Sequence, residues 1–527
     1  MENAISTEVL VVGAGPVGLT LAVALGQAGI RCTLVERKDA PQFLPKMERC
    51  NARTMEIFRR MGIAERVRAA GLRADVPMDV YIIEAMNRAP LLKHAYPSVS
   101  VARRAIDACT DGSLPLEPYQ LISQYTLEPL LKSIAESLPS VCVKYGHEFL
   151  SFHDDGSAVT AQVKQGGGVE TIQAKYLVGC DGGGSPVRQQ LGIRLEGESF
   201  TEFRQALYRC DELFDRIPIG PGPGRGRHYH VADEAFTFLI MQDSTRHWTL
   251  HARVERDEDM RAQFEKTIGV PVKYEMLHVG RWRQNLLLAD RYQSGRVFLA
   301  GDAVHLVIPT GGLGMNSGVG DAIDLAWKLA GTLRGWGGPR LLAAYEAERR
   351  KVGEFVLAAS TYASQGRRKW RSLWRNLDEL VRVAEVEQRK SNEMIGAELA
   401  YSYAGSPLVC NEPGGPAPEF REYRPTTWPG ARLPHVWLAG HVPIQDRIGQ
   451  GFSLLNFAGR ANDLSGLGGA FAGYGAPFEI LDLKEETARE LYGFDLILLR
   501  PDMHVAWRGN RAPQNANEIA AIATGHV

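Results

Sequence analysis

The stretch that decides the fold is Glu8-Val9-Leu10-Val11-Val12-Gly13-Ala14-Gly15-Pro16-Val17-Gly18, near the start of the chain. Its apolar run predicts a buried strand, and the residues from Val17 to Ala28 predict a helix that Gly29 ends. A second strand is predicted from Arg31 to Val35, with the acid Glu36 directly after it. A strand, a helix and a second strand in this order predict a βαβ unit within a parallel sheet.

The glycines of the first turn have the spacing Gly-x-Gly-x-x-Gly, which is typical of dinucleotide binding. Gly13 would make the turn, Gly15 would let the backbone approach a pyrophosphate, and Gly18 would let helix and strand pack closely. Glu36 follows at the roughly 20-residue spacing expected of an acid that binds a ribose diol. This acid does not distinguish NAD from FAD. A glycine-rich turn in an ordinary α/β domain is the alternative.

Two later stretches also predict a buried strand that ends in an acid and glycines. Tyr176–Arg188 contains Asp181, and Val297–His305 contains Asp302. The second of them continues into the glycine-rich Pro309–Asn316, which opens a predicted helix. Such a helix would aim its free N–H groups at a flat or phosphorylated ligand. Read alone, Asp181 is also compatible with a helix cap.

Composition limits the classes of partner. The 60 basic and 61 acidic residues give a net charge of −1, which offers no electrostatic case for binding nucleic acid. The seven cysteines are scattered without a Cys-x-x-Cys pair, a pattern that favours reduced thiols over a disulfide framework or a zinc site. Glu2 and Glu8 precede the first apolar run, unlike the basic start of a signal peptide, and no run has the length of a membrane span. We therefore expect a cytoplasmic protein without nucleic-acid or membrane partners.

Two basic clusters each allow two interpretations. Lys46, Arg49 and Arg53 follow the dinucleotide unit, where one of them could meet a cofactor phosphate or all could be solvated. Residues 366–375 are basic and amphipathic, which is compatible with a membrane surface or a partner. The patch is short, and this favours a solvated helix that packs on the body of the protein.

The region from 193 to 275 predicts short strands of an antiparallel sheet, whereas residues 76–116 predict irregular structure. One face of this sheet would be free for a small-molecule pocket. Its polar candidates are His228, Tyr229, His230 and His251. Core or cross-strand packing is the alternative for each of these side chains.

Taken in order, the three strand-and-glycine stretches resemble the para-hydroxybenzoate-hydroxylase-like flavoprotein monooxygenases, the single-component aromatic hydroxylases. Within them the chain is most similar to the phenol-hydroxylase branch, which includes 2,4-dichlorophenol, hydroxyphenylpropionate and polyketide hydroxylases. That branch carries a thioredoxin-like C-terminal domain, whose motifs are matched by Tyr423–His435, Asp446–Phe452 and Arg500–Gly509. The resemblance covers nearly the whole chain.

The resemblance implies an α/β fold in which a Rossmann-like FAD-binding domain contains an inserted antiparallel β-sheet substrate domain. A thioredoxin-like α/β domain would follow. The implied FAD-binding domain is discontinuous and comprises residues 1–75, 117–192 and 276–400. The substrate domain would comprise residues 76–116 and 193–275, and the C-terminal domain residues 419–527.

The resemblance also assigns FAD-binding residues. They are Gly13, Gly15, Pro16, Gly18, Glu36, Arg37, Lys46, Gln124, Asp181, Asp302, Pro309, Gly312, Gly314, Met315 and Asn316. In the family, Gln124 and Asp302 correspond to residues on the ribityl chain, and Pro309 with residues 311–316 to the loop around the isoalloxazine ring. Asp181 corresponds to a motif shared by FAD and NAD(P)H. Three positions depart from the family, because Lys46, Ile308 and Asp324 stand where arginine, proline and asparagine are frequent.

The implied activity is hydroxylation of a small phenolic aromatic substrate at the ortho or para position. NAD(P)H, with NADPH favoured, would reduce FAD, and dioxygen would then form a flavin hydroperoxide that the phenol attacks. The candidate catalytic residues are His228, Tyr229, His230, His251 and Pro309. One of the first four would act as the base that deprotonates the phenol. A role in aromatic compound catabolism and a homodimer are compatible with this interpretation.

Three other functions stay open at this point. The first is a Baeyer–Villiger or epoxidising flavin monooxygenase that acts on a polycyclic ketone or quinone, because fold alone does not separate these reactions. The second is a flavin reductase or oxidase that hydroxylates nothing. The third is a flavin-free nucleotide-binding or assembly protein with the C-terminal unit as an interaction module.

Overall fold

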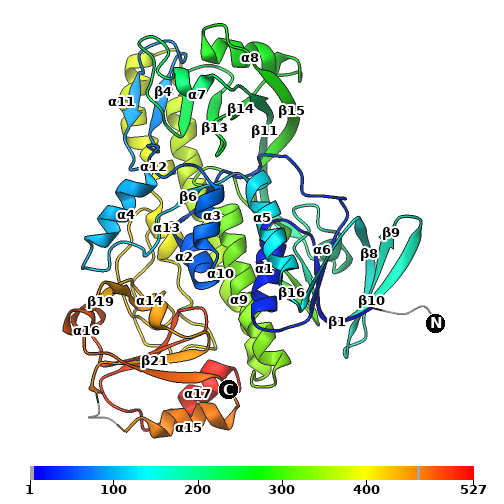
Figure 1. Cartoon of the computed structure of the whole chain (residues 1–527), viewed down its shortest axis with the longest axis vertical. Helices are drawn as coiled ribbons and strands as arrows, with labels where there is room; N and C mark the ends of the chain where they lie inside the picture. The colour runs from blue at the N-terminus through cyan, green and yellow to red at the C-terminus, as the bar shows by residue number, and fades with distance from the viewer. Residues whose placement is uncertain (1–4, 460–462) are drawn as a thin grey trace.

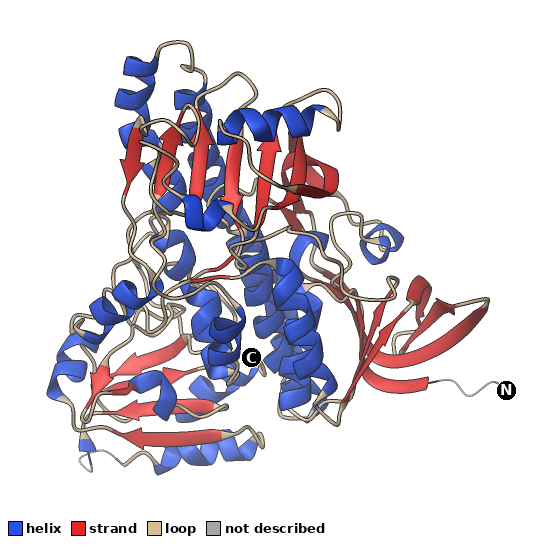
Figure 2. Ribbon diagram, turned by 45° about the horizontal axis from the view of Figure 1, so that its top comes forward, coloured by secondary structure: helices blue, strands red, loops and turns tan. Residues whose placement is uncertain are grey.

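The computed structural model describes residues 5–459 and 463–527 of the chain. Its large sheets form three bodies: a parallel sheet, a mostly antiparallel sheet and a smaller C-terminal sheet (Figures 1 and 2). Long central helices lie between these bodies (Figure 1). The α/β fold class predicted from the sequence is confirmed.

The parallel sheet is built around the strand that opens the chain. Its order is β16 (Gln293–Ser294), β17 (Val297–Leu299), β10 (Gly168–Gly179), β1 (Ile5–Val12), β2 (Cys32–Glu36) and β7 (Val141–Tyr145). β8 (His147–Asp154) and β9 (Val159–Gln165) extend β10 as an antiparallel meander. β1 pairs in parallel with β10 and β2, as the predicted βαβ unit requires.

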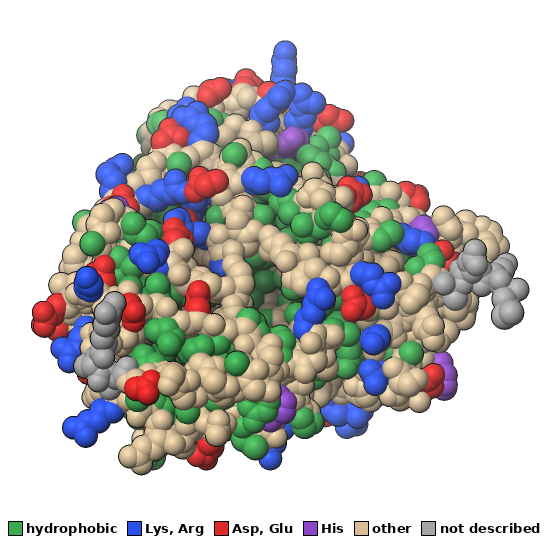
Figure 3. Space-filling view, turned by 60° about the horizontal axis from the view of Figure 1, so that its bottom comes forward, with side chains coloured by type: hydrophobic (Ala, Val, Ile, Leu, Met, Phe, Trp, Pro, Cys, Tyr) green, Lys and Arg blue, Asp and Glu red, His purple; other side chains and the backbone are tan. Residues whose placement is uncertain are grey.

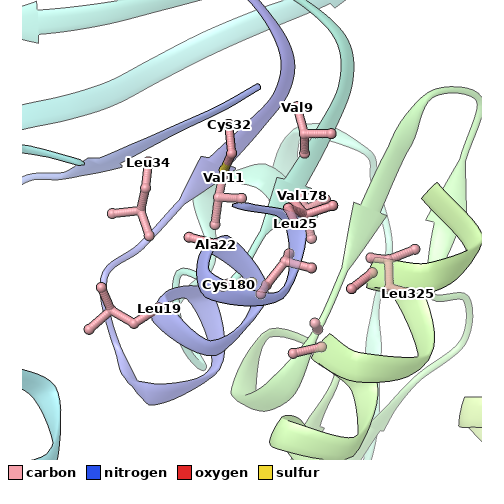
Figure 4. Packing of buried hydrophobic residues seen from close by; sticks show 14 of the residues in the cluster. Val9, Val11, Leu19, Ala22, Leu25, Cys32, Leu34, Val178, Cys180 and Leu325 are labelled. Atoms are coloured by element: carbon pink, nitrogen blue, oxygen red, sulfur yellow. The ribbon is translucent and has the colours of Figure 1, made fainter. Parts of the chain in front are cut away.

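Helices cover this sheet, which explains why the second half of its central strand, Val9–Val12, is apolar and buried. The helix α1 (Pro16–Gln27) packs against α5 (Gln124–Glu136) and α9 (Gly314–Leu333), and the apolar residues of all three join the core of the sheet. Val9 and Val11 of β1 are fully buried, together with Leu25 of α1 and Leu325 of α9 (Figure 4). Shorter elements complete this body: α2 (Ala52–Arg60), α3 (Ala64–Ala70), α6 (Pro186–Gln190), the 3-10 helix η1 (Gly301–Ala303), and β3 (Arg49–Cys50) paired with β6 (Gln120–Leu121).

The second sheet lies above the parallel one in Figure 1. Its order is β18 (His305–Leu306), β15 (Glu275–Ala289), β11 (Leu195–Arg209), β14 (His247–Ala252), β13 (Phe238–Met241), β12 (His228–Val231), β4 (Val80–Ile83) and β5 (Leu92–His94). The described pairs are antiparallel except β12 with β4, which is parallel. β15 continues this sheet well past residue 275. The helices α7 (Leu213–Arg216) and α8 (Asp259–Ile268) flank the sheet.

The prediction of irregular structure for residues 76–116 is wrong. This segment forms β4, β5 and the helix α4 (Val99–Asp107), whose first turn is capped by the side chain of Ser98. All four residues of β4 are buried, so the strand lacks the alternation of apolar and polar residues that would have revealed it. Its short apolar run does not by itself distinguish a buried strand from part of a buried helix. The pairing with β12 identifies it as a strand.

A 33-residue helix, α10 (Pro339–Arg371), connects the bodies. It packs against α9, meets the end of β15 where Arg350 donates to the carbonyl of Ala289, and reaches the loop before β13 at Arg371, which donates to the carbonyl of Phe236 (Figure 1). Midway, the hydroxyl of Ser360 donates to the carbonyl of Ile308 at 3.0 Å, which ties the helix to the glycine-rich loop. The helices α11 (Leu377–Glu387), α12 (Arg389–Asn392) and α13 (Ile395–Leu399) follow.

The C-terminal body has the strand order expected of a thioredoxin-like domain. β21 (Phe452–Asn456) pairs in parallel with β22 (Phe478–Asp482) and antiparallel with β23 (Leu496–Leu499), which pairs with β24 (Val505–Gly509). The helices α15 (Ser465–Gly473), α16 (Glu486–Tyr492) and α17 (Ala516–Thr524) accompany this sheet. The short β19 (Trp437–Leu438), β20 (Val442–Pro443) and α14 (Ile444–Arg447) precede it.

Buried ion pairs dock this domain onto the rest of the chain. The Arg500 guanidinium is fully buried and lies 2.5 Å from the carboxylate of Glu348 on α10 and 3.2 Å from that of Asp324 on α9. Asp324 also accepts from Lys328 at 2.6 Å. The acid at position 324, which departs from the family pattern, is thus paired with two cations.

The surface carries a mixture of charges. On the face shown in Figure 3, acidic and basic side chains are interspersed. Among the described residues, no helix combines the length and the apolar composition needed to cross a membrane.

Candidate active site

A cavity of about 1140 Å³ runs from the first βα turn to the antiparallel sheet. Its walls come from the turn after β1, from the loop that precedes α9, from the inner face of β12 to β14 and from the end of α10. Small-molecule pockets usually measure about 300–1,000 Å³. This cavity therefore has room for a large ligand together with a second, smaller one.

The three glycines of the first turn have different surroundings. A Cβ atom on Gly13 (φ +105°) would lie 2.5 Å from the carbonyl oxygen of Cys180, and one on Gly18 would lie 2.0 Å from that of Gly13. A Cβ on Gly15 would meet no atom within 4 Å, because this residue faces the cavity. Gly13 and Gly18 therefore allow the turn to form, and Gly15 leaves room for a ligand.

Glu36 is held at the edge of this turn by backbone amides. One carboxylate oxygen accepts from the amide of Ala14 at 3.0 Å and the other from the amide of Lys38 at 3.1 Å. Each carboxylate oxygen has a further lone pair. Because Glu36 and Arg37 both line the cavity, a ribose diol could bind there.

Two carboxylates line the middle of the cavity. One oxygen of Asp181 accepts from the amide of Val187 at 3.1 Å, while Oδ1 is buried without a hydrogen-bond partner in the described chain. Asp302 lies on η1 and is exposed to the cavity. Enclosure raises the pKa of both carboxyl groups. Hydroxyl donors from a ligand would satisfy these oxygens.

The loop before α9 presents the start of a long helix to the cavity. No side chain caps α9, and its first turn contains no acid. Gly311 (φ +92°) and Gly312 (φ +67°) have left-handed backbones that glycine adopts without strain. The guanidinium of Arg49 donates to the carbonyl of Gly311 at 2.7 Å and so fixes the loop. The free N–H groups of the α9 start are therefore available to an electron-rich ring edge.

Of the residues expected to bind FAD, only Gly18 does not line the cavity, because it packs behind the turn against Gly13. The residues that line it are Gly13, Gly15, Pro16, Glu36, Arg37, Lys46, Gln124, Asp181, Asp302, Pro309, Gly312, Gly314, Met315 and Asn316. Gln124 is bonded to Glu128 at 2.6 Å, and the amide of Asn316 is used by backbone groups. The unpaired Asp181 oxygen, the open Gly15 and the uncapped α9 together fit FAD.

The Glu48–His228 pair stands at the far end of the cavity. Nε2 of His228 lies 2.9 Å from both oxygens of Glu48, which also accepts from Arg227. The neighbouring Arg227 and His228 hold the pKa of the Glu48 carboxyl well below its usual range, whereas burial lowers the pKa of His228 to about 4. Neutral His228 thus carries its proton on Nε2, and its buried Nδ1 has no partner among the described residues.

His251 differs from His228 in which ring nitrogen has a protein partner: this nitrogen is Nε2 in His228 and Nδ1 in His251. The indole N–H of Trp282 donates to Nδ1 of His251 at 3.1 Å, and burial lowers the pKa of the imidazole to about 3. Indole nitrogen is only a donor, so neutral His251 carries its proton on Nε2. His251 therefore offers a donor to the cavity and no free lone pair. Its ring stacks on Phe238 at a centroid distance of 4.4 Å.

Two of the catalytic candidates lie outside this cavity. Tyr229 is fully buried in the core on the other face of β12, where its hydroxyl donates to Gly224 and accepts from the amide of Gly226. His230 is also fully buried, and its Nδ1 accepts from Arg371 at 2.7 Å. Their contacts are those of packing residues, so we leave both out of the catalytic set proposed below.

Sequence reasoning missed several residues that line the cavity. Glu48 and Arg227 were not singled out, and the 366–375 stretch was expected to be solvated. Instead, Arg367 and Arg371 of α10 face the cavity, and Arg371 is 3% exposed. Their spacing of four residues on one helix was the available signal. Arg53 is also not solvated, since it points to Tyr401 and the C-terminal domain.

Comparison with known proteins identifies the family. A family described as FAD binding domain matches residues 6–360, and one described as aromatic-ring hydroxylase, C-terminal, matches residues 426–525. The FAD-dependent monooxygenase apdD of Emericella nidulans is 32% identical over 569 aligned residues, which cover 98% of this chain and 90% of that protein. Aklavinone 12-hydroxylase RdmE of Streptomyces purpurascens is 31% identical over 97% of this chain and 96% of its own length.

Comparison with solved structures supports the same family. The rebeccamycin biosynthetic enzyme RebC with reduced flavin is 30% identical and has a TM-score of 0.90, with 100% of both chains covered. The resemblance drawn from the three sequence stretches is thereby confirmed. The chain belongs to the FAD-binding aromatic-ring hydroxylases, a family of FAD-dependent monooxygenases.

Proposed function

We propose that the protein is a single-component FAD monooxygenase that hydroxylates a phenolic substrate at the ortho or para position. Dioxygen and NAD(P)H, with NADPH favoured, are its other substrates. One observation carries this proposal: a continuous cavity joins the dinucleotide turn, the open start of α9 and a chamber with aromatic walls. The proposal includes the order of steps expected from the family resemblance, in which NAD(P)H is oxidised first and one oxygen atom of dioxygen is then transferred to the phenol.

The cofactor would lie with its ribose end at Glu36, its pyrophosphate at Gly15 and its ring beside Pro309. When bound, FAD would supply the redox chemistry that couples NAD(P)H oxidation to oxygen transfer. The helix dipole of α9 would stabilise negative charge at the ring edge by about 0.3–2 kcal/mol. Asp302 would accept from the ribityl hydroxyls, which satisfies a carboxylate that has no hydrogen bond to a described residue.

Two histidines would handle the substrate's hydroxyl group. His228, which lines the cavity, would be the base that takes the phenol proton, with Glu48 holding its imidazole by the contacts to Nε2. His251 would donate its Nε2 proton in a hydrogen bond to a substrate oxygen. The stacked Phe238 and the nearby Trp282 would cover the faces of the aromatic ring and exclude water.

We also infer a cytoplasmic location, a role in aromatic compound catabolism and a homodimer. The described cysteines are all free thiols, which supports a reducing compartment. Light scattering of the purified holoenzyme tests the oligomer, and a mass of one chain would exclude the dimer.

The central experiment is a panel of phenols given to the FAD-loaded protein. NAD(P)H oxidation, peroxide release and product mass are measured together under labelled dioxygen. A ring-hydroxylated product that contains one labelled oxygen is expected. A lactone would instead indicate Baeyer–Villiger insertion, and peroxide equal to the NAD(P)H consumed, with every phenol, would indicate an oxidase. Protein that cannot be loaded with FAD would exclude the whole proposal.

His228→Gln separates the proposed base from the redox steps. Product formation should fall about 10²–10⁴-fold, the usual contribution of a positioned base. Reduction of FAD by NAD(P)H should be unchanged. His247→Gln is the matched control, because His247 lies at the start of β14 and does not line the cavity. Equal product rates in both variants would remove His228 from the mechanism.

A further inference from the structure

Two arginines on α10 face the substrate chamber from the same side. Arg367 and Arg371 are four residues apart and so share one face of the helix. Both line the cavity where it borders β12, β13 and β14. The guanidinium groups of Arg367 and Arg371 lie 5.8 Å and 5.3 Å from the centre of the Phe238 ring.

Neither guanidinium has an anionic partner. No carboxylate of the described residues lies within 4.0 Å of Arg367 or Arg371, in contrast to Lys369 on the same helix, which pairs with Glu387 at 2.8 Å. Arg367 makes no hydrogen bond to a described residue. Arg371 donates only to the carbonyls of residues 236 and 237 and to Nδ1 of His230. The Nε atoms of both arginines are buried and unpaired.

The acids of the chamber are already engaged. Glu48 accepts from Arg227 and His228. Asp233 does not line the cavity and acts on Arg371 only from beyond 4.0 Å. The chamber histidines stay neutral because burial lowers their pKa values. Arg367 and Arg371 therefore carry two positive charges beside the chamber without a carboxylate of the described residues at ion-pair distance. Burial, with repulsion from Arg227, lowers the pKa of Arg367 to about 10. Burial, with repulsion from Arg367, lowers the pKa of Arg371 to about 9.

Two enclosed cations without an ion-pair partner are costly unless an anion joins them. We propose that the substrate is an aromatic acid whose carboxylate binds between Arg367 and Arg371, an inference that rests on the proposed hydroxylase function. A guanidinium offers two parallel N–H donors, which match the two oxygens of a carboxylate. The aromatic rings of Phe238 and Trp282 would contact the apolar part of the same molecule. The phosphates of NADPH are the other source of anionic charge, and the experiment separates the two.

The test compares matched acids and amides on the FAD-loaded enzyme. The probes are 3-hydroxy-2-naphthoate, 3-hydroxy-2-naphthamide and the unreactive 2-naphthoate, with binding followed by the change in flavin absorbance. The acids should bind at least tenfold more tightly than the amide. Arg367→Met should reduce the affinity of the acids to that of the amide and change amide binding less than twofold. Because Arg367 bonds to no described residue, this variant is expected to fold.

Arg375→Met is the matched control. Arg375 is exposed, follows α10 and does not line the cavity, so the acid preference should persist. Equal binding of acid and amide by the parent enzyme, or equal loss of both in Arg367→Met, would overturn the inference. A raised KM for NADPH with unchanged acid binding would assign the site to the nicotinamide cofactor and would also overturn it.

The two proposals fail separately. Hydroxylation of phenols without any preference for acids would leave the hydroxylase function standing and refute the carboxylate site. Arg367-dependent binding of 2-naphthoate, with no phenol hydroxylated, would support the carboxylate site and refute hydroxylation.

Discussion

The side-chain oxygen of Asn316 accepts a hydrogen bond from the backbone amide of Asn51 at 2.8 Å. The amide nitrogen of the same side chain donates to the carbonyls of Arg49 and Gly312. These bonds join the start of α9 to the segment that leads into α2. The loop expected to hold the flavin ring is thus positioned by an asparagine whose side-chain oxygen and nitrogen both bond to the protein backbone.

Asn316→Ala should therefore weaken FAD binding through the loop. It removes two buried hydrogen bonds and one partly buried one, so the free energy of unfolding should fall by about 1–3 kcal/mol. The FAD dissociation constant should rise roughly tenfold, which corresponds to about 1.4 kcal/mol. Denaturant titration and flavin fluorescence measure the two effects. Asn515→Ala is the control, since its exposed side chain bonds only Glu518 in the described chain, and an identical result for both variants would contradict the assignment.

Gly15→Ala and Gly18→Ala should separate cofactor binding from folding. The added methyl at Gly18 would lie 2.0 Å from a backbone oxygen, whereas at Gly15 it would meet no protein atom within 4 Å. Gly18→Ala should lower the melting temperature of the FAD-free protein, and Gly15→Ala should not. Gly15→Ala should still weaken FAD binding roughly tenfold or more, because the methyl occupies the pyrophosphate path. FAD affinity that is unchanged in Gly15→Ala would place the pyrophosphate elsewhere.

Arg500→Met should destabilise the docking of the C-terminal domain. Arg500 is fully buried between Asp324, Glu348 and Asp502. Removing one member of a buried charge network typically costs about 3–5 kcal/mol because the remaining charges are left unpaired. Urea unfolding measures the loss. Arg511→Met, an exposed site in the same domain, should change stability by less than about 0.5 kcal/mol, and a similarly small effect at Arg500 would refute the docking role.

Acid should destabilise the protein below about pH 6.5. Burial lowers the folded-state pKa of His228 and His504 to about 4 and that of His251 to about 3. The unfolded chain binds protons at these sites first, so stability is fully present above about pH 6.5 and falls as the pH approaches 4. At pH 5 each histidine should cost about 2 kcal/mol.

Urea titrations at pH 7.5 and pH 5 test this effect. His504→Gln should reduce the difference in unfolding free energy between the two pH values, whereas His153→Gln, at an exposed position, should not. The same pH dependence in both variants would rule out His504 as a contributor.

The sequence was most informative where local geometry dictates residue type. A turn that brings Gly18 against Gly13 accepts only glycine, so the dinucleotide unit can be recognised from the sequence. The same holds for the helix cap at Asn51, whose side chain accepts from the amide of Thr54. These features depend on residues close together in the chain.

Features that depend on residues far apart in the chain could not be predicted from the sequence. β4 is a strand because β12 pairs with it, although the two are nearly 150 residues apart in the chain. Glu48 gains its role from Arg227 and His228, which arrive from another sheet. Tyr229 and His230 looked equivalent to His228, but alternation along β12 turns Tyr229 to the other face and Arg371 covers His230. Periodicity alone does not report which neighbours a residue meets.

The spacing of Ser360 and Arg367 on α10 would determine which carbon atom of a bound aromatic acid is hydroxylated. Ser360 bonds the loop beside the expected flavin ring, and Arg367 lies seven residues further along the same helix. At 1.5 Å per residue, this separates the two positions by about 10 Å along a rigid element. An acid anchored at Arg367 would present to the ring only the carbon atoms at that separation. Lengthening the spacer between carboxylate and phenol should therefore move the new hydroxyl group to a different carbon.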